Sequence, residues 1–99
     1  MQNEQAKEAS LKVIADSPVK PGQVWRHVKT GNRYFVMAVA LDEVTLDPVV
    51  VYSGSDGVSW TRSLSVFLSK NEGHWRFVND DDVKVMIAAA VTLVPFSNG

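Results

Sequence analysis

The chain has 99 residues, 45% of them hydrophobic and 21% charged, which is the composition of a single globular domain rather than of a disordered segment. The net charge of −1 and the pI near 6.0 give no overall attraction to nucleic acid or to anionic membranes. Binding to either partner would need a local cluster of basic residues. The sequence contains no cysteine, which excludes disulfides, thiolate metal sites and cysteine nucleophiles.

The compartment is inferred from two further features. The first five residues are polar and carry no apolar core of a signal peptide. The longest apolar run, residues 85–91, is much shorter than the roughly 20 residues that cross a bilayer. We therefore expect a cytoplasmic protein without a membrane partner.

Residues 3–16 are predicted to form a helix, since most of them are good helix formers and Asn3 is a suitable N-cap. The residue before Pro18 avoids the helical region, which ends the helix there. Its apolar stripe, Leu11 and Ile14, is narrow, so the helix must dock on something to be stable. The simplest interpretation is a tether or lid without chemistry of its own.

Alternating or β-branched apolar runs separated by turn residues predict a meander of short strands. The second strand is apolar on both faces, which is typical of a central strand covered on both sides. Gly31 and Asn32 supply a tight hairpin before it, and Leu64, Phe67 and Leu68 suggest one helical turn that closes an end of the sheet. The five predicted strands are 24–29, 34–41, 49–52, 58–62 and 74–78.

These elements predict a mainly β domain with flanking helices, built on a small, five-stranded, partly open barrel. One domain, 1–99, would comprise an N-terminal helix (1–18), the barrel (22–78) and a helical, apolar C-terminal segment (80–96), although a strand stays open for 91–96. Residues 83–96 hold more large apolar side chains than one small barrel can cover, which predicts a homodimer.

The acidic run 79–82 is typical of a helix N-terminus, where the helix dipole favours negative charge. A metal site is the alternative, but no second ligand cluster completes it. We expect neither a metal nor another cofactor.

Five blocks of sequence carry a family resemblance. They read RHVK at 26–29, GNRYFV at 31–36, TLDPVVVY at 45–52, WTRSLSVF at 60–67 and RF at 76–77. In order and spacing they resemble the small bacterial and phage domain-of-unknown-function family 1653, over residues 21–78. The resemblance implies an SH3-like barrel and brings no established activity.

The chain departs from the family pattern at several places. Thr30 is an additional residue before the glycine, and Ser63 stands where the family has proline. The family's histidine and glutamate of its H-S-E-T block fall on Asp42 and Val44. Any chemistry shared by that histidine and glutamate would be lost or changed here.

The candidate ligand site combines basic and aromatic side chains from three predicted strands. Arginine recognises carboxylate or phosphate in a planar, bidentate way, and tyrosine and tryptophan add flat faces with a polar tip. We expect the two arginines to lie close together and beside an aromatic ring. The alternative is that Tyr52 and Trp60 are core residues and the arginines lie along the surface. The six candidates are Arg26, His27, Lys29, Tyr52, Trp60 and Arg62.

The leading hypothesis is a binding or adaptor module that recognises a peptide, a protein or a small anion. Nucleic-acid binding is the alternative, because aromatic residues interleave with basic ones. A small hydrolase or transferase using His27 with Tyr52 or Asp42 is the third, but no nucleophile or orienting carboxylate stands at a recognisable spacing, so we assign no catalytic residue.

Overall fold

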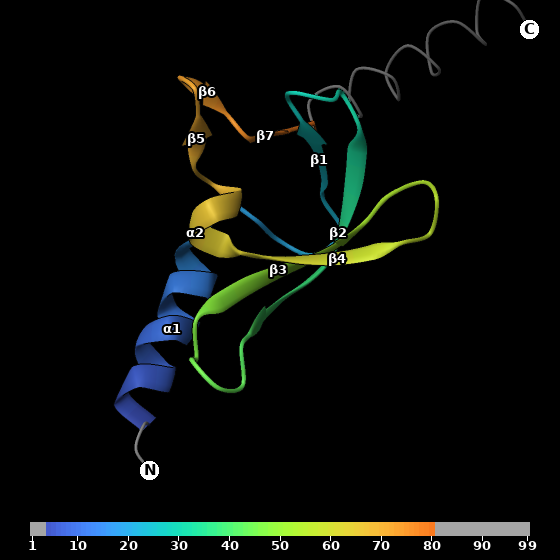
Figure 1. Cartoon of the computed structure of the whole chain (residues 1–99). Coiled ribbons are helices and arrows are strands. Elements are labelled where there is room, and N and C mark those ends of the chain that lie inside the picture. The colour runs from blue at the N-terminus through green and yellow to red at the C-terminus, as the bar shows by residue number, and fades with distance from the viewer. Residues whose placement is uncertain (1–3, 81–99) are drawn as a thin grey trace, which may run out of the picture.

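The computed structural model describes residues 4–80 of the chain (Figure 1). Strands dominate it, with one longer helix at the N-terminal end, so the mainly β class is confirmed. Along the chain the elements are α1 (Glu4–Asp16), β1 (Val24–His27), β2 (Arg33–Leu41), β3 (Pro48–Ser53), β4 (Ser59–Ser63), α2 (Leu64–Phe67), β5 (Lys70–Asn71), β6 (His74–Trp75) and β7 (Phe77–Asn79).

Five of the strands form one antiparallel sheet in the order β4-β3-β2-β1-β7. Gly31, with a φ of 78°, turns the chain from β1 into β2 in the region that glycine adopts without strain. The register of β2 on β3 shifts between Val36 and Ala38, and such a bulge increases the local twist. In Figure 1, β3 and β4 consequently run across the direction of β1.

The sheet is not closed. Strands β4 and β7 are its two edges, and no ladder joins them. The helical turn α2 follows β4 directly and lies over the opening, as the sequence predicts. The SH3-like barrel therefore stays a prediction, while the open five-stranded sheet is established.

The core lies between the concave face of this sheet and α2. Phe67 of α2 is fully buried and its ring stacks on Phe77 at 4.0 Å between centroids. Trp25 meets the same Phe67 ring edge-on at 5.4 Å. The Ser63 hydroxyl caps α2 by accepting a hydrogen bond from the Val66 amide at 3.2 Å. The buried apolar residues are Val19, Trp25, Val36, Val50, Tyr52, Leu64, Phe67 and Phe77.

The second predicted strand is central in the sheet, as expected. The prediction that both of its faces are covered is wrong. Phe35 and Met37 on the outer face of β2 are each 50% exposed. An apolar residue at every position indicates two buried faces only if a second layer exists, and the described part of the chain places none over these two side chains. Strand β3 is the better buried of the two.

The predicted last strand, 74–78, is also corrected. Strands β5 and β6 form a separate small hairpin, whose turn uses Glu72 and Gly73 at φ values of 53° and 83°. Arg76 then leaves the hairpin, because its amide donates to the Ser69 carbonyl and its carbonyl accepts from the Val28 amide. Only β7 joins the main sheet.

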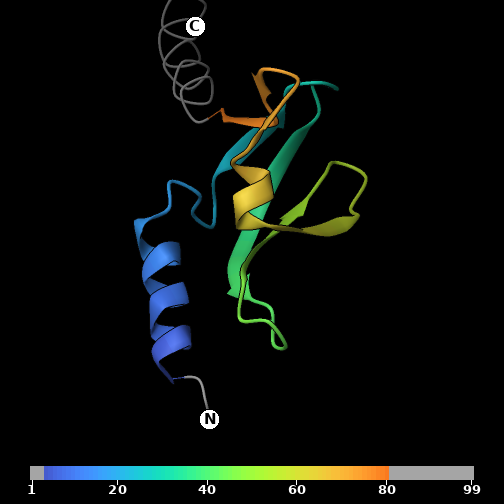
Figure 2. The ribbon, with the colours of Figure 1, turned by 60° about the vertical axis from the view of Figure 1, so that its left-hand side comes forward.

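Helix α1 stands beside the sheet as a separate element (Figure 2). None of its residues is buried, and Leu11 and Val13 are about half exposed. The chain is anchored just after it, where Val19 is fully buried and the Lys20 ammonium donates to the carbonyls of Ile14 and Ala15. The helix is thus tied at its C-terminal end more firmly than along its length.

Several expectations concern residues outside the described part. The C-terminal segment 80–96 is described only at Asp80, so its helix and the homodimer it would support stay predictions. The division of 1–99 into three parts likewise stays a prediction. No helix within residues 4–80 is long and apolar enough to cross a membrane.

Candidate functional site

The concave face of the sheet holds four of the six candidate residues. Cross-strand partners share a face, and His27 pairs with Phe77 while Tyr52 pairs with Trp60. Arg62 lies two positions after Trp60 on β4, so it projects to the same side. The structure therefore brings His27, Tyr52, Trp60 and Arg62 to one side of the sheet.

Arg62 is the centre of this arrangement. Its guanidinium carbon lies 5.7 Å from the centroid of the Phe77 ring, within the range of a cation–π contact. Burial raises the pKa of the Tyr52 hydroxyl above its usual value, and Arg62 offsets part of that rise through its charge and by hydrogen bonding. The guanidinium thus sits between a tyrosine hydroxyl and an aromatic face.

His27 is held beside Arg62 by packing and by a turn residue. Its ring meets Phe77 edge-on at 5.0 Å, and its Nδ1 lies 3.0 Å from the Thr30 hydroxyl. Desolvation lowers the pKa of His27, and the charges of Arg62, Arg76 and Lys29 lower it further. Both effects favour the neutral form of the imidazole.

The three cations that act on His27, together with His27 itself, are called the cation cluster here: His27, Lys29, Arg62 and Arg76. Within residues 4–80, no carboxylate lies within ion-pair distance of Lys29, Arg62 or Arg76. Arg76 is oriented by a hydrogen bond from its Nε to the Ser69 hydroxyl at 2.9 Å. The cluster therefore concentrates positive charge next to aromatic rings without an internal counter-ion.

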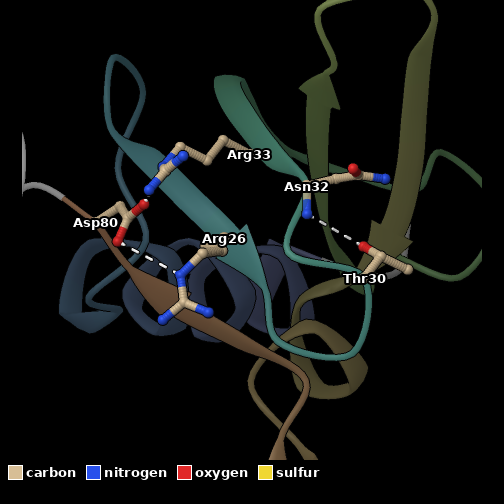
Figure 3. A network of polar contacts seen from close by, with 5 residues as sticks. All are labelled: Arg26, Thr30, Asn32, Arg33 and Asp80. Carbon is tan, nitrogen blue, oxygen red and sulfur yellow. Dashed lines mark hydrogen bonds and ion pairs between the residues drawn. The ribbon is translucent and has the colours of Figure 1, made fainter.

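Arg26 does not belong to the cluster, which corrects the expectation that it lies near Arg62. It pairs with Arg33 and Val78 on the convex face of the sheet. Its Nε lies 3.7 Å from one carboxylate oxygen of Asp80, while the Arg33 Nε donates to the other at 2.5 Å (Figure 3). Because side chains alternate along a strand, Arg26 and His27 must face opposite sides.

Asp80 is consequently a structural residue in this arrangement. Its side chain is only 5% exposed, and its amide donates to the Val24 carbonyl at 2.8 Å. On the convex face two arginines share this one carboxylate, so the group keeps a net charge of about +1. The cation cluster differs because no carboxylate within residues 4–80 lies within ion-pair distance of its lysine or its arginines.

Trp60, which is outside the cluster, and Lys29, which belongs to it, each line a small pocket. Trp60 is 51% exposed and lines a pocket of about 190 Å³ with Tyr34 and Asp56. Lys29 lines a smaller pocket, about 140 Å³, with His74 and Trp75. The alternative that Tyr52 and Trp60 are both core residues is therefore correct for Tyr52 and wrong for Trp60.

A third, larger cavity of about 580 Å³ lies where α1 meets the start of β3 and α2. Its walls include Val13, Pro48 and Leu64, with Asp16 and Asp47 at the rim and no basic side chain. Within residues 4–80, no group of three or more histidine, aspartate or glutamate side chains is placed to hold a metal ion.

The geometry around His27 gives no orienting carboxylate for catalysis. The partner of its Nδ1 is Thr30. Asp42 instead accepts hydrogen bonds from the amides of Val44 and Thr45, both at 2.9 Å, and these bonds lower its pKa. Asp42 thus stabilises the turn between β2 and β3.

The candidate set from the sequence omitted three residues that the geometry brings in. Arg76 and Phe77 form the last family block, so the signal for them was present in the motif. Tyr34 lies opposite Trp25 and edge-on to Tyr52 at 5.2 Å, which the period of two along the second strand already implied.

An open, five-stranded antiparallel sheet with a one-turn helix after β4 defines a small, mainly β domain, which carries basic and aromatic side chains on its concave face. Comparison with known families matches residues 23–79 to the family described as a protein of unknown function, DUF1653. The chain belongs to that family, as its five sequence blocks suggest. Neither the curated proteins nor the solved structures contain a match to the chain.

Proposed function

We propose that the protein is a non-enzymatic binding module that recognises a carboxylate-bearing segment of a peptide or partner protein through Arg62. The observation that carries this proposal is the cation cluster, in which the charges of Arg62, Arg76 and Lys29 lower the pKa of His27 while no carboxylate within residues 4–80 lies within ion-pair distance of these three side chains. The other sheet arginines, Arg26 and Arg33, already share Asp80. An anionic ligand would therefore supply the counter-ion that the cation cluster lacks, whereas Arg26 and Arg33 already have one in Asp80.

The chemistry of the site suits a carboxylate. Arg62 offers a planar fork of donors, and its contact with Phe77 limits the orientations of that fork. His27 becomes a further donor when a bound anion favours its protonated form. The aromatic rings of Tyr52 and Phe77 exclude water from one side, which strengthens each charged hydrogen bond.

The fold supports the same kind of function. The strand order, with the last strand returning beside β1 and a helical turn before it, is consistent with an SH3-like barrel that is open between β4 and β7. We propose this finer description of the sheet. The lack of cysteine fits a reducing compartment, which supports the cytoplasm as the location.

The experiment is an amide NMR titration with a capped heptapeptide of alternating glycine and aspartate. Wild type should show shifts confined to β1, β4 and β7, and Arg62→Gln should weaken binding about tenfold, or about 1.4 kcal/mol. Lys7→Gln removes the same charge from α1, far along the chain, and should change the affinity less than about twofold. Equal affinities for wild type and Arg62→Gln would refute the proposal.

Nucleic-acid binding is the second candidate, because Trp75 is half exposed and the Lys70 ammonium lies 4.7 Å from its ring. A base stacked on Trp75 would find Lys70 and Lys29 nearby. A single-stranded oligonucleotide should then bind with an affinity that falls steeply with salt. Glu72 lines the same pocket and opposes a phosphate, which is why the peptide carboxylate is preferred.

A further inference from the structure

A second recess is lined by Trp60, which stands two positions before Arg62 on β4. It lies between the β1–β2 turn and the β3–β4 turn, with the side chains of Tyr34, Trp60 and Asp56 among its walls. Its volume is about 190 Å³. That is below the roughly 300–1,000 Å³ of sites for drug-sized ligands, so one side chain is the natural occupant.

Two charged residues, Arg33 and Asp56, line this recess. Arg33 also borders it, but its guanidinium is bound to Asp80 on the convex face. Asp56 uses Oδ1 to accept a hydrogen bond from the Val58 amide at 3.0 Å, and no cation within residues 4–80 pairs with it. One carboxylate oxygen is therefore available to a ligand.

Aromatic walls and a glycine complete a recess suited to a cation. Trp60 is half exposed, and indole and phenol faces attract ammonium and guanidinium groups. The wall opposite is Gly54, where an added Cβ would lie 3.2 Å from the Tyr34 ring and 3.4 Å from Asp56 Oδ1. The absence of a side chain at Gly54 leaves the space between Tyr34 and Asp56 clear.

The two sites have the spacing of an extended peptide. Trp60 and Arg62 stand two residues apart on one face of β4, a repeat of about 7 Å. Alternate side chains of an extended ligand repeat at the same distance. A ligand that lies along β4 therefore presents side chains two positions apart to the recess and to Arg62.

We propose that the recess formed by Tyr34, Asp56 and Trp60 is a second subsite that receives a lysine or arginine side chain, located two positions from the acidic residue that Arg62 binds. This inference rests on the proposed function for the identity of the acidic residue. The partner is thus a peptide segment in which a basic residue alternates with an acidic one, and not a uniformly acidic tail.

Two capped heptapeptides of equal composition test the spacing. One is Gly-Lys-Gly-Asp-Gly-Lys-Gly, which places lysine two positions from aspartate on either side. The other is Gly-Gly-Lys-Asp-Lys-Gly-Gly, which places both lysines on the opposite side of an extended chain. The first should bind wild type about fivefold more tightly by NMR titration, equivalent to about 1 kcal/mol.

Substitutions in the recess test which side chains cause the preference between the two peptides. Asp56→Asn and Trp60→Ala should each remove the preference between the two peptides, and both positions are exposed, so the fold should survive. Thr61→Ala, an exposed position on the opposite face of β4, should preserve it. Equal affinities of the two peptides for wild type, or an unchanged preference in Asp56→Asn, would overturn the second subsite.

The outcome is separable from that of the proposed function. N-acetyl-lysine amide alone, at millimolar concentration, should shift the Trp60 indole resonance in wild type and in Arg62→Gln, but not in Asp56→Asn. A shift of this kind without any binding of the aspartate peptide would overturn the Arg62 site and leave the lysine recess standing. No shift in wild type would overturn the recess, whatever Arg62 does.

Discussion

The guanidinium carbon of Arg62 lies 5.7 Å from the centre of the Phe77 ring, and the two residues belong to opposite edges of one sheet. Arg62 is on β4 and Phe77 is on β7, which share no backbone ladder. A cation–π contact, worth about 0.5–2 kcal/mol, therefore connects two strands that no backbone hydrogen bond joins. The residue that spans the opening is also the one we propose as the ligand-binding arginine.

Replacing Arg62 with lysine tests whether the planar fork matters or only its charge. Arg62→Lys keeps the positive charge but loses the bidentate geometry and part of the contact with Phe77. The affinity for the alternating aspartate peptide should fall about fivefold, or about 1 kcal/mol, compared with a larger loss in Arg62→Gln. An affinity equal to that of wild type would mean that a point charge suffices.

Asp80→Asn should destabilise the fold without affecting the ligand. The side chain is nearly buried and serves both Arg26 and Arg33, so losing its charge should lower the free energy of unfolding by about 2 kcal/mol. Urea denaturation gives the value. Asp16→Asn is the control, because its exposed pair with Lys12 contributes only about 0.3–0.5 kcal/mol.

The same variant separates the two faces of the sheet. If Asp80→Asn remains folded, its affinity for the aspartate peptide should match that of wild type, since Asp80 pairs with Arg26 and Arg33 on the convex face while Arg62 and His27 lie on the concave face. A large loss of affinity in a folded Asp80→Asn protein would contradict this separation.

His27 should make the protein less stable in mild acid. Its pKa is lowered in the folded state by desolvation and by the nearby cations, so the unfolded chain takes up the proton first as the pH falls below about 6.5. Above that pH His27 causes no loss of stability. As the pH falls from about 6.5 to the lower pKa of the folded state, the free energy of unfolding decreases progressively. Urea denaturation at pH 7.5 and 5.5 measures the loss.

The His27→Gln variant should show a smaller loss of stability between the two pH values than wild type. Comparing the differences between pH values cancels any constant effect of the substitution on packing. His74→Gln, on the small hairpin, should keep the full loss. The interpretation is wrong if His27→Gln loses as much stability as wild type.

Gly54→Ala should narrow the recess beside Trp60. The new methyl group would lie 3.2 Å from the Tyr34 ring, so that ring must shift by a few tenths of an ångström. We expect a loss of about 1 kcal/mol in stability and a weaker preference for the lysine peptide. Thr61→Ala, which lies outside the recess, is the comparison. Unchanged Tyr34 resonances in Gly54→Ala would contradict the predicted contact.

Much of the sheet could be predicted because its signals are local. Period-two patterns and turn residues placed the strands and the β1–β2 turn at Gly31, and the spacing of Leu64 and Phe67 predicted α2. The exposed side of β2 could not be predicted in this way. Whether Phe35 is covered depends on where a separate helix docks, and the pattern of the strand does not determine that.

In the candidate site, too, local patterns were predictable and contacts between distant residues were not. His27, Tyr52 and Arg62 came together because each projects to one face of its strand. Arg26 was misassigned because its place in a shared block outweighed the alternation along β1, which already puts it opposite His27. Its partner Asp80 is 54 residues away, and no local pattern predicts so distant an ion pair.

The most direct test of the account is the pKa of His27 with and without the aspartate peptide, measured from its ring resonances by NMR. A carboxylate bound among Lys29, Arg62 and Arg76 must oppose the charges that lower this pKa in the free protein. The account predicts that a saturating concentration of peptide raises the His27 pKa, and that Lys7→Gln shows the same rise. An unchanged His27 pKa at saturation would show that the peptide binds elsewhere and would contradict the proposed site.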